Sequence, residues 1–392
     1  MRPDPIADLD RWIRGEFTAL NTELEELYFA EKQLLLPDRA EVTARTAVLR
    51  RDGENLIARI ADRRELPPGR DERYELLGQV GFYLAACRRH EVEPDQTRVA
   101  PLALALGTSL GVAPRFSSAH QHMHNRAVGG AFHSFTTLDA ERIFLTRNGL
   151  AVLAYRRAAH ALRGVPPLGL SNPLATYHLA DAVAALGDVL RQSRQLAVEL
   201  DPERFFFSIR PYFKSHLVGG QEYRGANAGD FAAVNAIDVL LGLCSPHDPF
   251  YRRVLAEKAP YLAPSDQGLL RALPTTGSLL AALEAELAGR PSEPLRENAR
   301  LLLDACRAHG AASVFHHQRL VLPFLQEPAS HTPAEQQADL TTSGPPLDVV
   351  LAGLARLRDL RAARPRAGLE TARPALDRVR ALLDTGLAAR CS

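Results

Sequence analysis

The sequence is poor in several features that mark common classes of protein. Lysine occurs only at Lys32, Lys214 and Lys258, so arginine supplies almost all of the positive charge, and the formal net charge is +1. A nearly neutral chain has no bulk attraction for nucleic acid or for an anionic membrane surface. We therefore expect neither nucleic acid nor a membrane among its partners.

Closely spaced cysteines and long apolar runs are also missing. Cys87, Cys244, Cys306 and Cys391 lie far apart and form neither a CxxC pair nor the CxxCH pattern of covalent haem attachment. Isolated cysteines are typical of a reducing compartment. No segment approaches the ~20 apolar residues of a membrane span, and the first residues, MRPDPIADLDRWIRGEF, place charges where a signal peptide has its apolar segment. The sequence predicts a cytoplasmic protein.

Strand-like alternation with hairpin turns is nearly absent, whereas helical periodicity is widespread. Apolar residues recur on one face in 17–36, 73–89, 176–199, 234–243, 279–288, 298–308, 347–362 and 374–388. Breaks rich in proline and glycine separate these segments, for example LPPGR at 66–70 and TTSGPP at 341–346. This pattern predicts an all-α fold.

The length of the chain favours more than one hydrophobic core. It has 392 residues, and single cores usually stop growing at roughly 250–300 residues. The stretch 107–138 is rich in glycine, serine and histidine and has little helical periodicity. We therefore expect a smaller N-terminal helical domain over 1–140 and a larger C-terminal helical domain over 141–392.

The first of two histidine clusters is an HxHxH pattern. It consists of His120, His122 and His124, and His133 follows nearby. On a strand the three would share one face and bind a metal, whereas on a helix only the first and third would. Two readings stay open, a non-haem metal site and a polar loop whose histidines line a cleft or face solvent.

The second histidine cluster is SVFHHQRLVLPFL at 313–325. The residues three, four and seven positions after His317 are all apolar, whereas the same steps from His316 reach an arginine and a proline. A neutral imidazole on an apolar helix face suits axial ligation of a buried planar cofactor. The alternative is a core histidine bonded to a carbonyl group.

A third candidate site is FFFSIR, where Arg210 follows three phenylalanines. A guanidinium group holds a carboxylate through two parallel hydrogen bonds, and flanking aromatic rings exclude water from them. The alternative is an arginine that bridges two helices at the surface. GANAG at 225–229 lacks the GxGxxG spacing of a nucleotide fold, but its small residues would let main-chain groups approach a ligand.

The order of these motifs resembles that of the indoleamine 2,3-dioxygenase superfamily of histidine-ligated haem oxygenases. The residues that carry the resemblance are FFFSIRPYF and GANAGDFAAVNAIDVLLGL. Within the superfamily, the sequence is most similar to the monodechloroaminopyrrolnitrin synthase family of pyrrolnitrin biosynthesis, through RPYFKSHLVGGQEYRG, QVGFYLAACRRHEVEP and HQRL. The resemblance spans roughly 75–360 and implies an indoleamine 2,3-dioxygenase-like helical bundle.

The resemblance implies a role for individual residues. His317 would be the proximal ligand of haem b, Arg210 would bind a substrate carboxylate, and His120 would be a distal-side residue. The residues implied to contact the substrate are Phe205 and Phe206 as walls, Asn227 and Ala228 through their backbone, and Thr342, Ser343 and Gly344 in a closing loop.

Two departures from the dioxygenases argue against ordinary tryptophan ring opening. GANAGDFA replaces GGSAGQSS, which puts Asp230 and Phe231 near the pocket rim, and two prolines stiffen a shortened closing loop, TTSGPP. The resemblance implies a haem-dependent oxygenase of specialised metabolism that uses O2 or peroxide on an aromatic amino acid or a tryptophan-derived substrate. An electron donor or reductase is a further expected partner, and ring dioxygenation, hydroxylation and oxidative rearrangement all stay open. The alternatives are an HxHxH metalloenzyme and a non-catalytic haem- or ligand-binding helical protein.

Overall fold

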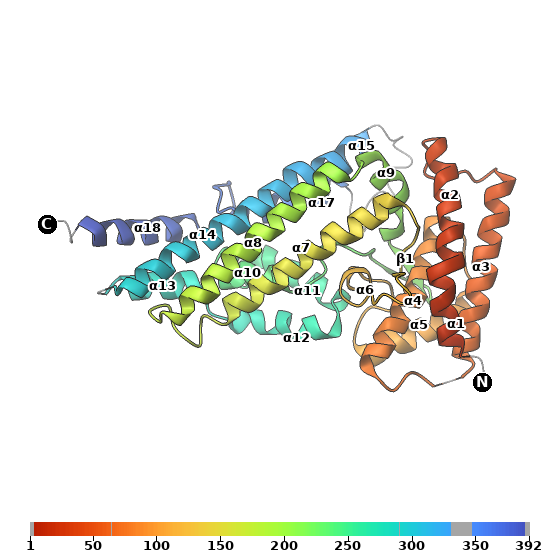
Figure 1. The fold of residues 1–392 in the computed structure, drawn as a ribbon, viewed down its shortest axis with the longest axis horizontal. Helices are drawn as coiled ribbons and strands as arrows, with labels where there is room; N and C mark the ends of the chain where they lie inside the picture. The colour runs from red at the N-terminus through yellow and green to blue at the C-terminus, as the bar shows by residue number, and fades with distance from the viewer. Residues whose placement is uncertain (1–3, 64, 290, 331–346, 389–392) are drawn as a thin grey trace.

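A computed structural model describes residues 4–63, 65–289, 291–330 and 347–388 (Figure 1). Its C-terminal part is built on long helices: α7 (Asp139–Arg163), α8 (Leu174–Glu199) and α14 (Glu293–Phe315) lie side by side, and α17 (Leu347–Arg361) packs on α14. Their apolar stripes face inward, so Leu179, Leu186 and Leu302 have no exposed surface. The all-α prediction is confirmed.

Shorter helices cover this layer. They are α10 (Ala233–Leu240), α11 (Pro249–Lys258), α12 (Pro264–Ala272), α13 (Leu279–Leu287) and α18 (Arg373–Ala388), with the 3-10 turns η4 (Ala259–Tyr261) and η5 (Leu273–Thr275) between them. All residues of α10 are buried, which places the predicted 234–243 segment at the centre of the C-terminal core. No helix in the described ranges is long and apolar enough to span a membrane.

The N-terminal part is a group of helices beside one end of the long layer (Figure 1). It contains α1 (Pro5–Trp12), α2 (Thr18–Ala30), α3 (Ala40–Ala61), α4 (Arg70–Arg89), α5 (Gln96–Leu110) and the short α6 (Ser118–His122). From Leu76 to Cys87 every residue of α4 is buried, as expected for a helix enclosed on all sides.

The N-terminal core extends into the later part of the chain. It combines Phe82 and Phe135 with Tyr212, Phe213 and even Phe324. The second large core lies among α7, α8, α10 and α14. A domain boundary near residue 140 therefore stays a prediction, since the segment around residue 210 shares a core with the first part.

Among the described residues, π-helical turns occur at η1 (Ile13–Phe17), η2 (Phe205–Ile209) and η6 (His316–Gln326). The segment η2 follows α9 (Pro202–Arg204) and leads into the 3-10 turn η3 (Arg210–Phe213), while η6 leads into α15 (Glu327–Ser330). Pro323 lies inside η6, where its missing N–H prevents a regular α-helical ladder. Such turns are frequent at functional sites, and two of these three carry predicted site residues.

One short hairpin departs from the expected absence of strands. β1 (His216–Val218) pairs with antiparallel β2 (Gln221–Tyr223). Gly219 and Gly220 connect them with φ values of 60° and 81°. Two consecutive left-handed residues form the tight turn that favours glycine, so the GG pair was a usable hairpin signal.

Candidate functional site

Arg210 is a buried cation at the junction of η2 and η3. Its residue surface is 8% exposed, and its guanidinium carbon lies 5.9 Å from the centroid of the Phe206 ring. Within the described part of the chain, no carboxylate or hydrogen-bond acceptor pairs with it. Burial lowers the pKa of Arg210 to about 10. An uncompensated buried charge is costly, so this position suits the carboxylate of a ligand.

A buried ion pair holds the segment that carries Arg210. Arg89 donates to both carboxylate oxygens of Glu25, at 2.7 and 2.8 Å, and also to the carbonyl oxygens of Leu34 and Phe207, at 2.6 and 3.1 Å. Neither charged side chain has exposed surface. Because Phe207 belongs to η2, this pair ties α2 and α4 to the turn that ends at Arg210.

The two phenylalanines expected as pocket walls face different neighbours. The Phe205 ring lies 5.2 Å from that of Phe144 and 5.7 Å from that of Phe324, centroid to centroid. Phe206 instead packs in a separate cluster with Leu34, Phe207 and Leu347. Leu347 is the first residue described after 331–346; the predicted loop residues Thr342, Ser343 and Gly344 lie outside the described residues.

His317 and His316 lie on different sides of η6. His317 is 7% exposed and shares a buried face with Val321 and Phe324, which confirms the predicted apolar face, whereas His316 is exposed. The Nε2 atom of His317 is buried and has no hydrogen-bond partner in the described ranges. Burial, and then the charge of Arg358, lower the pKa of His317, so the imidazole is neutral near pH 7.

These features fit a haem-iron ligand in two respects and oppose it in one. A neutral imidazole with an unpartnered, buried Nε2 in apolar surroundings is what axial ligation needs. However, Nη1 of Arg358 lies 3.4 Å from Nδ1 of His317. Since a guanidinium group only donates, this contact favours a proton on Nε2, and ligation requires that proton to be on Nδ1. The guanidinium group of Arg358 also pairs with the carboxylate of Asp359, the next residue in the chain, at 2.7 Å.

The HxHxH pattern does not assemble a metal site. His120 stacks on Tyr74, with ring centroids 4.1 Å apart, and His124 meets the edge of the same ring. His122 points elsewhere and bonds through Nε2 to Asn148 at 2.7 Å. Among the residues that the structure describes, no group of three histidine, cysteine or acidic side chains is arranged to hold a metal ion.

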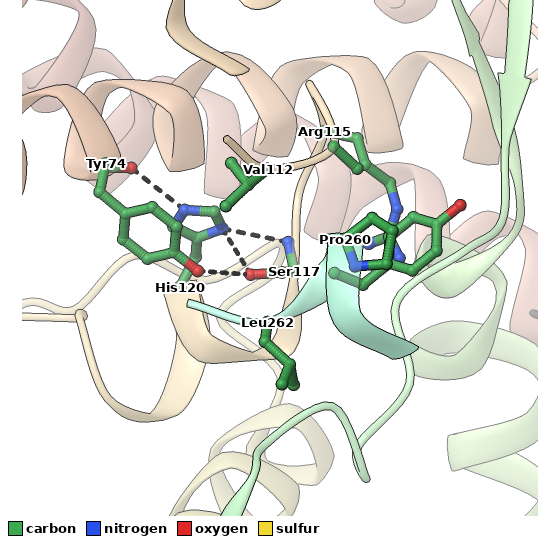
Figure 2. A pocket seen from close by; sticks show the side chains of 9 residues that line it. Tyr74, Val112, Arg115, Ser117, His120, Pro260 and Leu262 are labelled. Carbon is green, nitrogen blue, oxygen red and sulfur yellow. Dashed lines mark hydrogen bonds between the residues drawn. The ribbon is translucent and has the colours of Figure 1, made fainter. Parts of the chain in front are cut away.

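Both ring nitrogens of His120 are occupied by protein groups (Figure 2). Its Nδ1 accepts from the Ser117 main-chain N–H at 3.0 Å, and its Nε2 lies 3.1 Å from the Tyr74 carbonyl oxygen, to which it donates. Burial, and then the charge of His124, lower the pKa of His120 to about 3. The structure thus gives His120 a capping role at the start of α6, and its distal-side role stays a prediction.

The small-residue segment forms a compact turn before α10. Asn227 is exposed, and its side-chain oxygen accepts from the Gly229 N–H at 2.8 Å, while Ala228 is half-buried. Asp230 is only 2% exposed and pairs with Arg224 at 2.8 Å. The carboxylate expected at a pocket rim is therefore buried and neutralised, so it does not act as a free negative charge there.

The structure also reveals a buried polar network that motif reading missed. Asp238 accepts from Tyr251 at 2.8 Å, from His309 at 2.7 Å and from Arg361 through two nitrogens. Burial alone would raise the pKa of Asp238, but Arg361 and His309 outweigh it and hold that pKa below its ordinary value. His309 and Arg361 lie 71 and 123 residues from Asp238 in sequence, so no local pattern indicates these two partners.

Comparison with known protein families places this site within a known family. A sequence model of the family described as "Monodechloroaminopyrrolnitrin synthase PrnB" matches residues 4–383. The matched range includes η2, η3, α10 and η6, which carry Arg210, the small-residue turn, Asp238 and His317.

Proposed function

Because this chain belongs to the monodechloroaminopyrrolnitrin synthase PrnB family, we propose that it is an enzyme of specialised metabolism acting on a tryptophan-derived substrate. In more detail, we propose a haem b-dependent oxygenase that uses O2 or peroxide. The family name denotes a synthase, which supports an enzyme over a passive ligand carrier. The divergent histidines of the HxHxH pattern give no support to the metalloenzyme alternative.

The observation that carries the proposal is the buried guanidinium of Arg210. A buried arginine normally has an anionic partner, and Arg210 has none among the described residues. The carboxylate of an amino acid would supply that partner through two parallel hydrogen bonds. The rings of Phe205 and Phe206, within a few residues of Arg210, would exclude water and strengthen these bonds.

His317 is the residue proposed to hold haem through its unpartnered Nε2. Bound haem would supply the oxidising chemistry, whereas the protein contributes orientation, electrostatics and a dry cavity. The apolar neighbours of His317, Val321 and Phe324, would keep water away from the proximal side. The neutral state of the imidazole leaves its nitrogen lone pair available for ligation.

Arg210 would mainly fix the orientation of the substrate. Anchoring the carboxylate at one point places the aromatic ring at a set distance from it, and such positioning can remove up to about 7–11 kcal/mol from a reaction barrier. Whether the outcome is ring dioxygenation, hydroxylation or oxidative rearrangement depends on the ring position presented to the oxidant. The contacts that would choose among them involve the substrate itself.

Substrate-dependent oxygen consumption tests the proposal. The haem-reconstituted protein should consume oxygen with L-tryptophan or a ring-halogenated relative, in the presence of a reductant, and much less with tryptamine, which has no carboxylate. Haem binding without any oxygen or peroxide reactivity would favour the ligand-binding alternative. Equal rates with tryptamine and tryptophan would remove Arg210 from the substrate site.

A further inference from the structure

A small cavity lies between the N-terminal part and the turn η4, apart from Arg210 and His317 (Figure 2). Its volume is about 10 Å3, which is room for one small species. Its lining includes Tyr74, Val112, Arg115, Ser117 and Tyr261. His120, which caps α6, also lines the cavity, whereas Arg210 and His317 do not.

Arg115 is the charged residue of the cavity wall. It is 1% exposed, and its guanidinium carbon lies 4.3 Å from the centroid of the Tyr261 ring. Its terminal nitrogens donate to the carbonyl oxygens of Phe116 and Gly225, the latter at 3.0 Å. The Nε atom is buried and has no hydrogen-bond partner in the part of the chain that the structure describes. Burial lowers the pKa of Arg115 to about 10, although the charge of Asp230 acts in the opposite direction.

The carboxylate nearest to Arg115 is already shared. Asp230 bonds to Arg224 at 2.8 Å but approaches the Arg115 guanidinium only to 3.9 Å, beyond hydrogen-bond length. The guanidinium carbon of Arg224 lies 4.1 Å from the centroid of the same Tyr261 ring. One aromatic ring is thus in contact with two cations.

Two further charged groups, Lys258 and Asp266, lie beyond the residues that line the cavity. Lys258 is attracted by Asp230 and repelled by Arg224, and burial lowers its pKa to about 8. Asp266 is the second nearby carboxylate, and it accepts from the Ala232 N–H at 2.9 Å. Arg115 and Arg224 thus share the single carboxylate of Asp230, which leaves one positive charge in excess among these three groups.

We propose that this cavity binds one small monovalent anion of the halide class, with chloride as the physiological example. A water molecule would accept a hydrogen bond from the Nε–H of Arg115 but would leave the excess positive charge. A halide ion would accept that hydrogen bond and also neutralise the charge. A carboxylate or phosphate is too large for a space of about 10 Å3. Because Arg115 also bonds to the carbonyl of Gly225, the anion would stabilise the start of the small-residue turn.

Thermal unfolding at constant ionic strength tests this site without haem or substrate. The melting temperature of the wild-type protein should rise saturably when sodium gluconate is exchanged for sodium chloride or bromide, because gluconate cannot enter. Val112→Ile, which fills the cavity, should abolish the rise, and Val112→Ala should retain it. Equal melting temperatures in all three salts, or a chloride effect that persists in Val112→Ile, would overturn the proposal.

Bromide crystallography of the wild-type protein decides the matter if Val112→Ile does not fold. An anomalous bromide peak within hydrogen-bond distance of Nε of Arg115 is the expected result. A cavity that contains only water in crystals grown with bromide would contradict the site. Neither outcome bears on haem binding by His317, so the two proposals fail independently.

Discussion

The ring of Phe205 meets the ring of Phe324 edge-on, with centroids 5.7 Å apart. Phe205 begins η2, which leads directly to Arg210, and Phe324 lies in η6, which also carries His317. Aromatic pairs in this geometry are worth about 0.5–1.5 kcal/mol beyond the area that they bury. The contact therefore links the two segments that carry the main candidate groups.

Removing the charge of Arg210 should stabilise the ligand-free protein. Arg210→Met deletes a buried cation that has no anionic partner among the described residues, so the free energy of unfolding should rise by about 1 kcal/mol, as is common when function is sacrificed for stability. Arg89→Met is the matched control. It leaves the carboxylate of Glu25 buried without its cation, so the free energy of unfolding should fall by about 3–5 kcal/mol. Urea unfolding measures both, and a loss of stability in Arg210→Met comparable to the control would show that Arg210 is internally compensated.

Replacing Arg210 by lysine should weaken carboxylate binding while leaving haem in place. Lysine keeps the charge but cannot make two parallel hydrogen bonds, so affinity for L-tryptophan should fall, and Arg210→Ala should lose roughly 2–5 kcal/mol. Arg204→Lys, at a paired and more exposed position, is the control. Isothermal titration with the substrate and with tryptamine separates loss of the carboxylate contact from loss of the whole pocket.

Arg358 should weaken haem binding because its guanidinium group contacts Nδ1 of His317. Arg358→Gln offers a carbonyl acceptor there instead of a donor, which favours the proton on Nδ1 and frees Nε2 for ligation. Haem affinity should rise several-fold in this variant, as measured by haem transfer to a scavenger protein. Substitution of Arg364, an exposed arginine in the same region, by glutamine should leave the transfer rate unchanged. Faster transfer of haem from Arg358→Gln than from the wild type would contradict the tautomer argument.

Stability should fall below about pH 6.5 partly because of His120. Its pKa in the folded protein is about 3, below its ordinary value near 6.5, so the unfolded chain binds the proton first as the pH drops. The contribution of His120 is complete above about pH 6.5 and is lost at about 1.4 kcal/mol per pH unit as the pH falls toward 3. His120→Asn should reduce that slope between pH 6 and 4, whereas substitution of the exposed His247 by glutamine should not.

Several long helices were predicted because they carry a sustained apolar stripe, whereas α3 and α7 were not among the predicted segments. Periodicity over 73–89 corresponds to α4 (Arg70–Arg89), and periodicity over 176–199 corresponds to α8 (Leu174–Glu199). Local periodicity does not reveal where a helix widens into a π turn, so η2 and η6 were missed although their residues were singled out. The hairpin was missed because three-residue strands show no alternation.

The burial of His317 was predictable from the sequence, whereas the pairings of the candidate site residues were not. The buried face of His317 followed from the spacing of Val321 and Phe324. The contact between His317 and Arg358 joins residues 41 positions apart, and the hydrogen bond from His120 to the Tyr74 carbonyl joins residues 46 positions apart. Such pairings arise from tertiary packing, which a motif in one sequence does not encode.

The most direct test of the central claim is the visible absorption spectrum of three haem-reconstituted proteins: wild type, His317→Ala and His316→Ala. Wild type and His316→Ala should show the same Soret band of a histidine-ligated haem, because His316 is exposed and His317 is buried with a free Nε2. His317→Ala should lose the band or retain haem only weakly, and added imidazole should restore it. An unchanged spectrum in His317→Ala, or loss of the band in His316→Ala instead, would contradict the assignment of His317 as the ligand.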